Sequence, residues 1–479
     1  MLEPAYQADV VVVGAGVAGL AAAHRLTSAG VTTAVLEAAP YVGGRMSTEK
    51  VDGFRLDRIG QLLNTSYPQL ALSPGLDALV LRPFAPGVLL HNDGRHFRAG
   101  APAHGGSARS ALHVVRALTS APRPPLPRPS SLTRAAVPRP SAPDSSVPRS
   151  SAAPFFEGPP SGRRGIGAPL RLRTALGRIA ATPVERLLSR PESTAREALA
   201  ARGLPARTVD GFLRPLLAAL LCDPELTTSS RCADLALHSF VSGRLCLPEG
   251  GAEVLPELLA RTLPPGTVHT GVRVTSVSTT AVTTAEHGVI RCRAVLVATD
   301  ARAAAELLPG LRVPDFHPVT VVHHTTDEPP ETGGYLLLDA DRGGPVAHTS
   351  VVSRVDPARA PAGRALVSST VLGVPPADVD TAARRHLSRL YGTSTARWET
   401  LAVHHTPDAV PAMRPPHDPR RPVRLLAGLY VCGDHRDTST VQGALHSAHR
   451  AAAAILGDLS AGRPMHHADP APTTPRAAA

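Results

Sequence analysis

A glycine motif near the start of the chain, Gly14-x-Gly16-x-x-Gly19, constrains the fold more than any other feature of this sequence. A short run of valines precedes it, and residues 17–29, which have the composition of a helix, follow it. A second β-branched run then spans residues 31–37. Short continuous apolar runs of this kind are typical of parallel strands that are buried on both faces. The motif and its flanks therefore predict a strand–turn–helix–strand unit and an α/β fold.

The spacing of the three glycines is the one that a bound dinucleotide requires. Gly14 permits a tight turn, Gly16 lets the backbone approach a pyrophosphate, and Gly19 lets the helix pack closely on the strand. The free N–H groups at the start of the helix, at Val17 and Ala18, then face the anion. We therefore expect these five residues to bind a dinucleotide cofactor.

The residues after the second predicted strand distinguish between dinucleotides. Glu37, followed by Ala38, can accept hydrogen bonds from the ribose hydroxyls of adenosine, and its charge would repel a 2′-phosphate. That much fits NAD and FAD equally. The sequel, Gly43-Gly44-Arg45, adds a second glycine turn and a guanidinium group beside the same pyrophosphate. This sequel favours FAD.

These motifs resemble those of the superfamily of flavin amine oxidases, phytoene desaturases and protoporphyrinogen oxidases, which carry a GxGxxG motif, an acidic residue and a GGR-type turn. The resemblance covers most of the chain, and it recurs in LPEGGAEVLPELLA (247–260), VRVTSV (272–277), RAVLVATD (293–300) and GLYVCGDHRDTSTVQGALHSAHRAA (428–452). It implies an α/β fold with a Rossmann-type FAD-binding domain of the glutathione-reductase-like kind and a discontinuous, mixed α+β substrate domain. The cofactor that it implies is FAD.

The resemblance also implies how the chain is divided. The FAD-binding domain would comprise residues 1–75, 245–302 and 408–460, and the substrate domain residues 76–120, 165–244 and 303–407. Residues 121–164 are rich in proline, serine and arginine and have no periodicity, so they bury too little apolar surface to offset the entropy of ordering. We expect a disordered insertion there and a disordered tail at residues 461–479.

Further cofactor contacts follow from the resemblance alone. Gly60 and Gln61 would lie close to the isoalloxazine ring, and Val274 would offer its backbone to adenine. Gly433 and Asp434 would contact the pyrophosphate and the ribityl chain. Gln442 and Ala444 would begin a helix whose N-terminus faces the flavin pyrimidine. The positive end of the helix dipole would favour an anionic reduced flavin.

The reaction is less constrained than the cofactor. Amine oxidases of the superfamily commonly place a lysine near flavin N5 and an aromatic pair around the amine, but Lys50, the only lysine, follows the GGR turn, and aromatic residues make up 3% of the chain. We therefore expect hydride transfer from a mostly apolar substrate to flavin N5, with oxygen or a quinone-type molecule as the electron acceptor. A flavin amine oxidase and a non-enzymatic flavin-binding interaction protein remain open as alternatives. No catalytic acid or base can be named.

The charge and composition of the chain bear on its binding partners and its cellular localisation. The net charge is +11, but no basic face with interleaved aromatic residues accompanies it, so we expect no nucleic-acid partner. The histidine pairs at 323–324, 404–405 and 466–467 lack ligand spacing, and we expect no metal site. The five cysteines form no C-x-x-C pair and predict reduced thiols, and with no recognisable leader they favour a cytoplasmic protein. A lipophilic substrate leaves peripheral membrane contact open.

Overall fold

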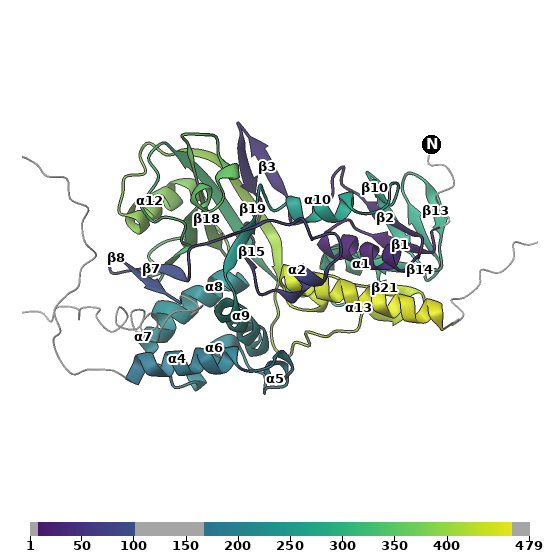
Figure 1. Cartoon of the computed structure of the whole chain (residues 1–479), viewed down its shortest axis with the longest axis horizontal. Helices are drawn as coiled ribbons and strands as arrows, with labels where there is room; N and C mark the ends of the chain where they lie inside the picture. The colour runs from purple at the N-terminus through teal and green to yellow at the C-terminus, as the bar shows by residue number, and fades with distance from the viewer. Residues whose placement is uncertain (1–7, 101–166, 462–479) are drawn as a thin grey trace, which may run out of the picture.

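The computed structural model describes residues 8–100 and 167–461 (Figure 1). The expected disordered insertion at 121–164 and all of the expected tail beyond residue 461 lie outside the described residues. Within the described ranges, no helix has the length and apolar content that crossing a membrane requires.

A six-stranded sheet forms the centre of the dinucleotide-binding half, in the order β10, β2, β1, β14, β21, β20. Neighbouring strands run parallel, except that β20 is antiparallel to β21. The strands are β1 (Val10–Val13), β2 (Thr33–Glu37), β10 (Val268–Thr270), β14 (Ala294–Val297), β20 (Arg424–Leu426) and β21 (Leu429–Val431). The first two strands and the helix between them confirm the predicted α/β unit.

Both faces of this sheet are covered. Val10 and Val12 pack in one core cluster with helices α1 (Val17–Ser28), α10 (Val254–Arg261) and α13 (Val441–Ser460). Val11 and Val13 point the other way, toward helix α11 (Ala301–Leu307) and the antiparallel strands β11 (Val274–Val277), β12 (Ala281–Thr284) and β13 (Gly288–Arg291). This alternation explains why β1 is an unbroken run of valines.

Two runs that looked like single strands in the sequence are each divided between two sheets. Residues 268–277 split into β10 and β11, because Gly271 takes a φ of +73° and turns the chain. Residues 289–298 split into β13 and β14, where Arg293 and Ala294 both donate a backbone hydrogen bond to the Asp9 carbonyl. Both halves of each run contain β-branched residues, so the break between the two strands is not visible in the sequence.

The second half of the molecule is built on a seven-stranded mixed sheet, in the order β19, β15, β18, β17, β16, β7, β8. The strands are β7 (Val88–Asn92), β8 (Arg95–Ala99), β15 (Phe316–Thr326), β16 (Leu337–Asp339), β17 (Val346–Val351), β18 (Ala365–Leu372) and β19 (Glu399–Pro411). The β7–β8 hairpin turns at Asp93-Gly94, a dipeptide that favours such turns because both of its residues readily take positive φ, as they do here. The expected domain boundary at 408 falls inside β19, which stays in this sheet to Pro411.

Helices and small sheets complete this half. Helix α12 (Val379–Tyr391) packs on one face of the seven-stranded sheet, and a helical lobe lies beneath it in Figure 1. The lobe contains α4 (Gly167–Ala180), α5 (Val184–Leu188), α6 (Ala195–Ala201), α7 (Ala206–Thr208), a π-helical turn (Val209–Leu213), α8 (Arg214–Leu221) and α9 (Ser230–Ser242). The connecting elements are α2 (Pro68–Leu72), the pair β3 (Thr48–Val51) and β4 (Phe54–Asp57), and the sheet β5 (Leu63–Asn64), β9 (Leu245–Pro248) and β6 (Leu81–Pro83).

Candidate cofactor and active site

A cavity of about 650 Å³ lies at the carboxyl ends of β1, β2 and β14, where open α/β sheets bind their ligands. Most of the residues that the sequence predicted at the cofactor line this cavity: Gly14, Gly16, Val17, Ala18, Glu37, Ala38, Gly43, Gly44, Arg45, Gln61, Val274, Gly433, Asp434 and Ala444. Gly19, Gly60 and Gln442 are not among its lining residues. Segments more than four hundred residues apart thus meet around one space.

The three glycines of the first motif have different surroundings. Gly14 takes a φ of +104°, and a Cβ added there would lie 3.1 Å from the Ala298 carbonyl. A Cβ at Gly19 would lie 2.0 Å from the Gly14 oxygen, so this glycine allows helix and strand to pack. A Cβ at Gly16 would meet no atom within 4 Å. Gly16 therefore faces open space at the N-terminus of α1, which fits a cofactor pyrophosphate.

Glu37 supports the glycine turn in addition to lining the cavity. Its Oε2 accepts a hydrogen bond of 2.8 Å from the Ala15 amide, and its Oε1 accepts one of 2.9 Å from the Ala39 amide. The carboxylate is thereby held at the end of β2 with its remaining lone pairs free for other donors. Sequence reasoning assigned Glu37 a contact with the ribose but did not foresee these two backbone contacts.

The second glycine turn is joined directly to the first. The Gly43 amide donates to the Ala15 carbonyl at 2.9 Å. Arg45 then reaches across the cavity, where its Nη1 donates to the Ala409 carbonyl at 2.9 Å and its Nη2 donates to Asp434 Oδ1 at 2.6 Å. Burial works to lower the pKa of Arg45, but the Asp434 carboxylate outweighs burial and the pKa is raised. Arg45 therefore remains a cation beside the proposed pyrophosphate position.

The last segment of the cavity precedes and begins α13. Gly433 takes a φ of +139°, and its amide donates to Ser447 Oγ at 3.0 Å. Thr440 caps the helix by accepting from the Gly443 amide at 3.1 Å. Gln442 is directed elsewhere, since its Oε1 accepts from the Gln69 amide at 3.0 Å. The N-terminus of α13 nevertheless faces the cavity through Ala444.

A model of the family of flavin-containing amine oxidoreductases matches residues 17–456. The chain belongs to this family. It is accordingly an FAD-dependent oxidoreductase, in agreement with the cofactor that its sequence predicted. Membership favours the enzymatic interpretation over the non-enzymatic one that the sequence left open.

Curated relatives of this flavin-containing amine oxidoreductase match over short segments. A putrescine oxidase of Kocuria rosea is 52% identical over 68 residues, which is 14% of each chain. A polyamine oxidase of Oryza sativa is 55% identical over 51 residues, or 10% of each chain. The aligned segments thus span only a small part of the length of these relatives.

Solved structures match over nearly the whole chain. A putrescine oxidase bound to putrescine superposes with a TM-score of 0.61 at 18% identity, covering 94% of this chain and 99% of that one. A protein from an Exiguobacterium species described as a protoporphyrinogen oxidase gives 0.64 at 16% identity, covering 94% and 98%. A reduced UDP-galactopyranose mutase gives 0.63 at 12% identity, covering 96% and 99%. At these identities the matches establish the Rossmann-type fold with its substrate domain, and nothing about substrate.

An aliphatic cluster packs against Gly60, a residue expected near the isoalloxazine ring, although its side chains are not among those that line the cavity. A Cβ at Gly60 would lie 3.6 Å from Val321 Cγ2 of β15. Val321 belongs to an apolar cluster with Ile59, Val319, Ala409 and Val410, to which Cys222 and Leu372 add partly buried side chains. We call these residues the aliphatic wall. Sequence reasoning missed it, because its members come from five segments that lie far apart in the chain.

Lys50 lies away from this wall. Its Nζ is 3.0 Å from Glu253 Oε1, and its side chain is 59% exposed. The only lysine of the chain is therefore engaged in a surface ion pair at β3, as expected from its position after the GGR turn.

Two buried histidines adjoin the site. His435 follows Asp434, both its ring nitrogens lack a hydrogen-bond partner, and burial lowers its pKa to about 4. His317 lies on β15 an even number of residues before Val319 and Val321, so it shares their face of the strand. Its Nε2 is buried without a hydrogen bond, 3.9 Å from Asp223 Oδ2, and burial lowers its pKa. Both rings are therefore neutral near pH 7.

Proposed function

We propose that this FAD-dependent oxidoreductase removes a hydride from a mostly apolar organic substrate held against the aliphatic wall. The observation that supports the proposal is the packing of Val321 of β15 against Gly60, a residue expected near the isoalloxazine ring: a Cβ added at Gly60 would lie 3.6 Å from Val321 Cγ2. When bound, FAD supplies a two-electron acceptor at flavin N5. The aliphatic wall would exclude water and favour binding of an apolar substrate through the hydrophobic effect.

The cofactor contacts proposed here follow from the residues that line the cavity. Gly16 and the amides of Val17 and Ala18 would hold the pyrophosphate, and Arg45 would add a guanidinium donor on its other side. Glu37 would accept from the adenosine ribose, and the backbone of Val274 would contact adenine. Gly433, Asp434 and the N-terminus of α13 would face the ribityl chain and the flavin pyrimidine.

The position of Lys50 supports dehydrogenation over simple amine oxidation. In the family resemblance, a lysine from the substrate domain lies near flavin N5. Here Lys50 pairs with Glu253, and the aliphatic wall contains no aromatic side chain. A neutral His317 on the same face of β15 is the group best placed to accept a proton from a substrate that carries one. Oxygen or a quinone-type acceptor would then reoxidise the flavin.

An anaerobic titration tests this function. The FAD-loaded protein is mixed with a panel of lipophilic molecules that carry a C–H bond next to a double bond, and loss of the visible flavin band is followed. We expect bleaching by members of this panel. Val321 is buried against Gly60, so in Val321→Phe the added ring would push into the expected ring position, and the rate of bleaching should fall at least about tenfold. Val374→Phe adds the same bulk at an exposed residue and should leave the rate unchanged.

Amine oxidation is the second candidate, and the activities named for two relatives favour it. Putrescine oxidase and polyamine oxidase are among the curated matches. The same anaerobic titration with mono-, di- and polyamines decides between the two. Bleaching by amines alone, with release of ammonia or peroxide once oxygen is admitted, would overturn the first proposal and support the second.

We also propose that the protein contacts a membrane surface peripherally, because its proposed substrate is lipophilic. An apolar substrate partitions into bilayers, so an enzyme acting on it gains by touching the membrane surface. Co-sedimentation of the full chain with anionic vesicles should exceed co-sedimentation with neutral vesicles, given the net charge of +11. Equal, background-level sedimentation with both would count against membrane contact.

A further inference from the structure

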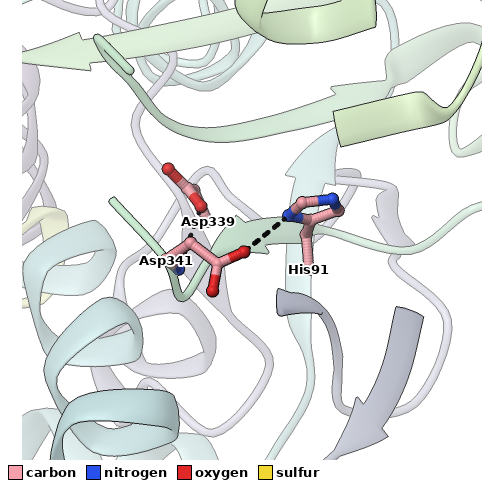
Figure 2. Close-up of side chains that lie close together, drawn as sticks. All are labelled: His91, Asp339 and Asp341. Atoms are coloured by element: carbon pink, nitrogen blue, oxygen red, sulfur yellow. Dashed lines mark hydrogen bonds and ion pairs between the residues drawn. The ribbon is translucent and has the colours of Figure 1, made fainter. Parts of the chain in front are cut away.

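Three side chains with ligand atoms meet at the carboxyl ends of β7 and β16, two adjacent strands of the seven-stranded sheet (Figure 2). His91 of β7 and Asp339 of β16 are register partners in a parallel ladder, so their side chains emerge on the same side. Asp341 follows in the loop after β16. One ligand atom from each residue lies within 4.8 Å of the other two. None of the three lines the dinucleotide cavity.

Neighbouring donors hold both carboxylates in place. Asp341 Oδ1 accepts from the Asn92 side-chain amide at 2.7 Å, and Asp341 Oδ2 accepts from the Asp93 backbone amide at 3.0 Å. Asp339 Oδ2 accepts from the Gly343 amide at 2.7 Å, and His386 Nε2 lies 3.2 Å from the same oxygen. Asp339 Oδ1 accepts one hydrogen bond, from the Asp341 amide at 3.1 Å, so this oxygen and Asp341 Oδ1 each keep a lone pair for a further partner. Outer hydrogen bonds of this kind orient metal ligands.

The His91 ring is buried, and one of its nitrogens is unsatisfied. The residue is 8% exposed, and Nδ1 has no hydrogen-bond partner although it lies 3.3 Å from Asp341 Oδ2. Figure 2 shows the ring directed at the Asp341 carboxylate. A buried polar atom without a partner is uncommon and costly. A cation between the ring nitrogen and the carboxylates would satisfy it.

We propose that His91, Asp339 and Asp341 bind a divalent transition-metal cation such as Zn²⁺ or Mn²⁺. Two carboxylates balance the double charge, and the imidazole nitrogen favours transition metals over Mg²⁺ and Ca²⁺, which prefer oxygen ligands alone. The Asp341 side chain is 29% exposed, so ions have a path of entry and water completes the coordination. The ion would tie β7 to the loop between β16 and β17.

This inference departs from the sequence-based expectation of no metal, which considered only adjacent histidine pairs. His91 lies in the β7–β8 hairpin, and the aspartates lie about 250 positions later, as the separation of 249 between Asn92 and Asp341 indicates. It does not depend on the proposed function, because the site is separate from the cofactor cavity.

The test uses the full, untagged, FAD-loaded chain after treatment with a chelator. Zn²⁺ and Mn²⁺ are titrated separately by calorimetry, and Mn²⁺ binding is also followed by electron paramagnetic resonance. We expect one ion per chain and a higher melting temperature. Asp341→Asn removes a ligand charge at a partly exposed side chain and should weaken binding by at least about tenfold. Asp93→Asn removes the same charge from the neighbouring β7–β8 turn, outside the ligand set, and should bind as the wild type does.

The outcome is decisive in both directions. Absence of stoichiometric binding of either ion to the wild-type chain would overturn the proposal, and so would equal affinity in Asp341→Asn. If Asp341→Asn were to lose its fold, as judged by circular dichroism, Asp339→Asn and the wild-type stoichiometry carry the test. Retained flavin absorbance in all variants distinguishes loss of the ion from loss of the cofactor site.

Discussion

Arg45 and Asp434 stand 389 positions apart in the chain and form an ion pair with 2.6 Å between Nη2 and Oδ1. The pair joins the second glycine turn to the segment before α13, and both residues line the dinucleotide cavity. The Arg45 Nη1 donates to Ala409 in addition. One guanidinium thus connects three segments, two of which line the cavity.

Arg45→Lys should weaken FAD binding while preserving charge. An ammonium group cannot reach Asp434 and the Ala409 carbonyl with the geometry of a guanidinium fork. We expect the dissociation constant for FAD to rise about tenfold, equivalent to about 1.4 kcal/mol. Fluorescence quenching of FAD by the apoprotein measures it. An unchanged constant would show that this pair does not shape the cofactor site.

Gly16→Ala and Gly19→Ala should separate cofactor binding from folding. A methyl group at Gly16 enters open space, so the apoprotein should keep its stability to within about 0.5 kcal/mol. Its affinity for FAD should nevertheless fall at least about tenfold, because the methyl group occupies the proposed pyrophosphate position. Gly19→Ala clashes with the Gly14 oxygen and should lose about 1–3 kcal/mol of stability. Urea unfolding of both apoproteins, with FAD titrations, checks the contrast; similar behaviour of the two variants would contradict it.

Arg359 should be among the residues on which stability depends most. Its side chain is 1% exposed, its Nε donates to Asp356 Oδ2 at 3.1 Å, and its Nη2 donates to Asp57 Oδ2 at 2.9 Å. Arg359→Met leaves two buried carboxylates without their cation and should lower the free energy of unfolding by about 3–5 kcal/mol.

Arg302→Met is the matched control for that variant. Its ion pair with Asp408 is exposed and should contribute only about 0–1 kcal/mol. Urea unfolding of both variants gives the comparison. Equal losses in the two would mean that burial of the Arg359 network does not set its contribution.

Stability should decline in mild acid, in part through His348. Burial lowers the pKa of His348 to about 4 from an ordinary value of 6.5. Between these values the unfolded chain binds a proton that the folded chain does not, so the free energy of unfolding falls as the pH drops from 6.5 to 4. One such group accounts for about 3 kcal/mol, present in full above pH 6.5. Urea unfolding at stepped pH should give a shallower decline in His348→Gln; parallel curves would exclude the effect.

The sequence predicted the parts of the fold that contiguous residues determine. The strand–turn–helix around Gly14, Gly16 and Gly19 was predictable because each glycine has a local steric reason that few other residues satisfy. The Asp93-Gly94 hairpin was predictable for the same reason, since both residues take positive φ. The run at 268–277 was not, because a single turn at Gly271 moves half of it to another sheet without changing its apolar pattern.

The same distinction between local and distant residues applies to the candidate site. By itself, the sequence predicted FAD as the cofactor, a dinucleotide site at the first glycine turn, and a position of Lys50 too early in the chain for a substrate-side lysine. Only the tertiary structure decided that Arg45 meets Asp434, that Val321 faces Gly60, and that His91 lies beside Asp339 and Asp341. Local steric constraints depend on neighbouring residues and can be recognised in the sequence. Contacts between distant segments depend on strand order and register, which many residues throughout the chain determine together.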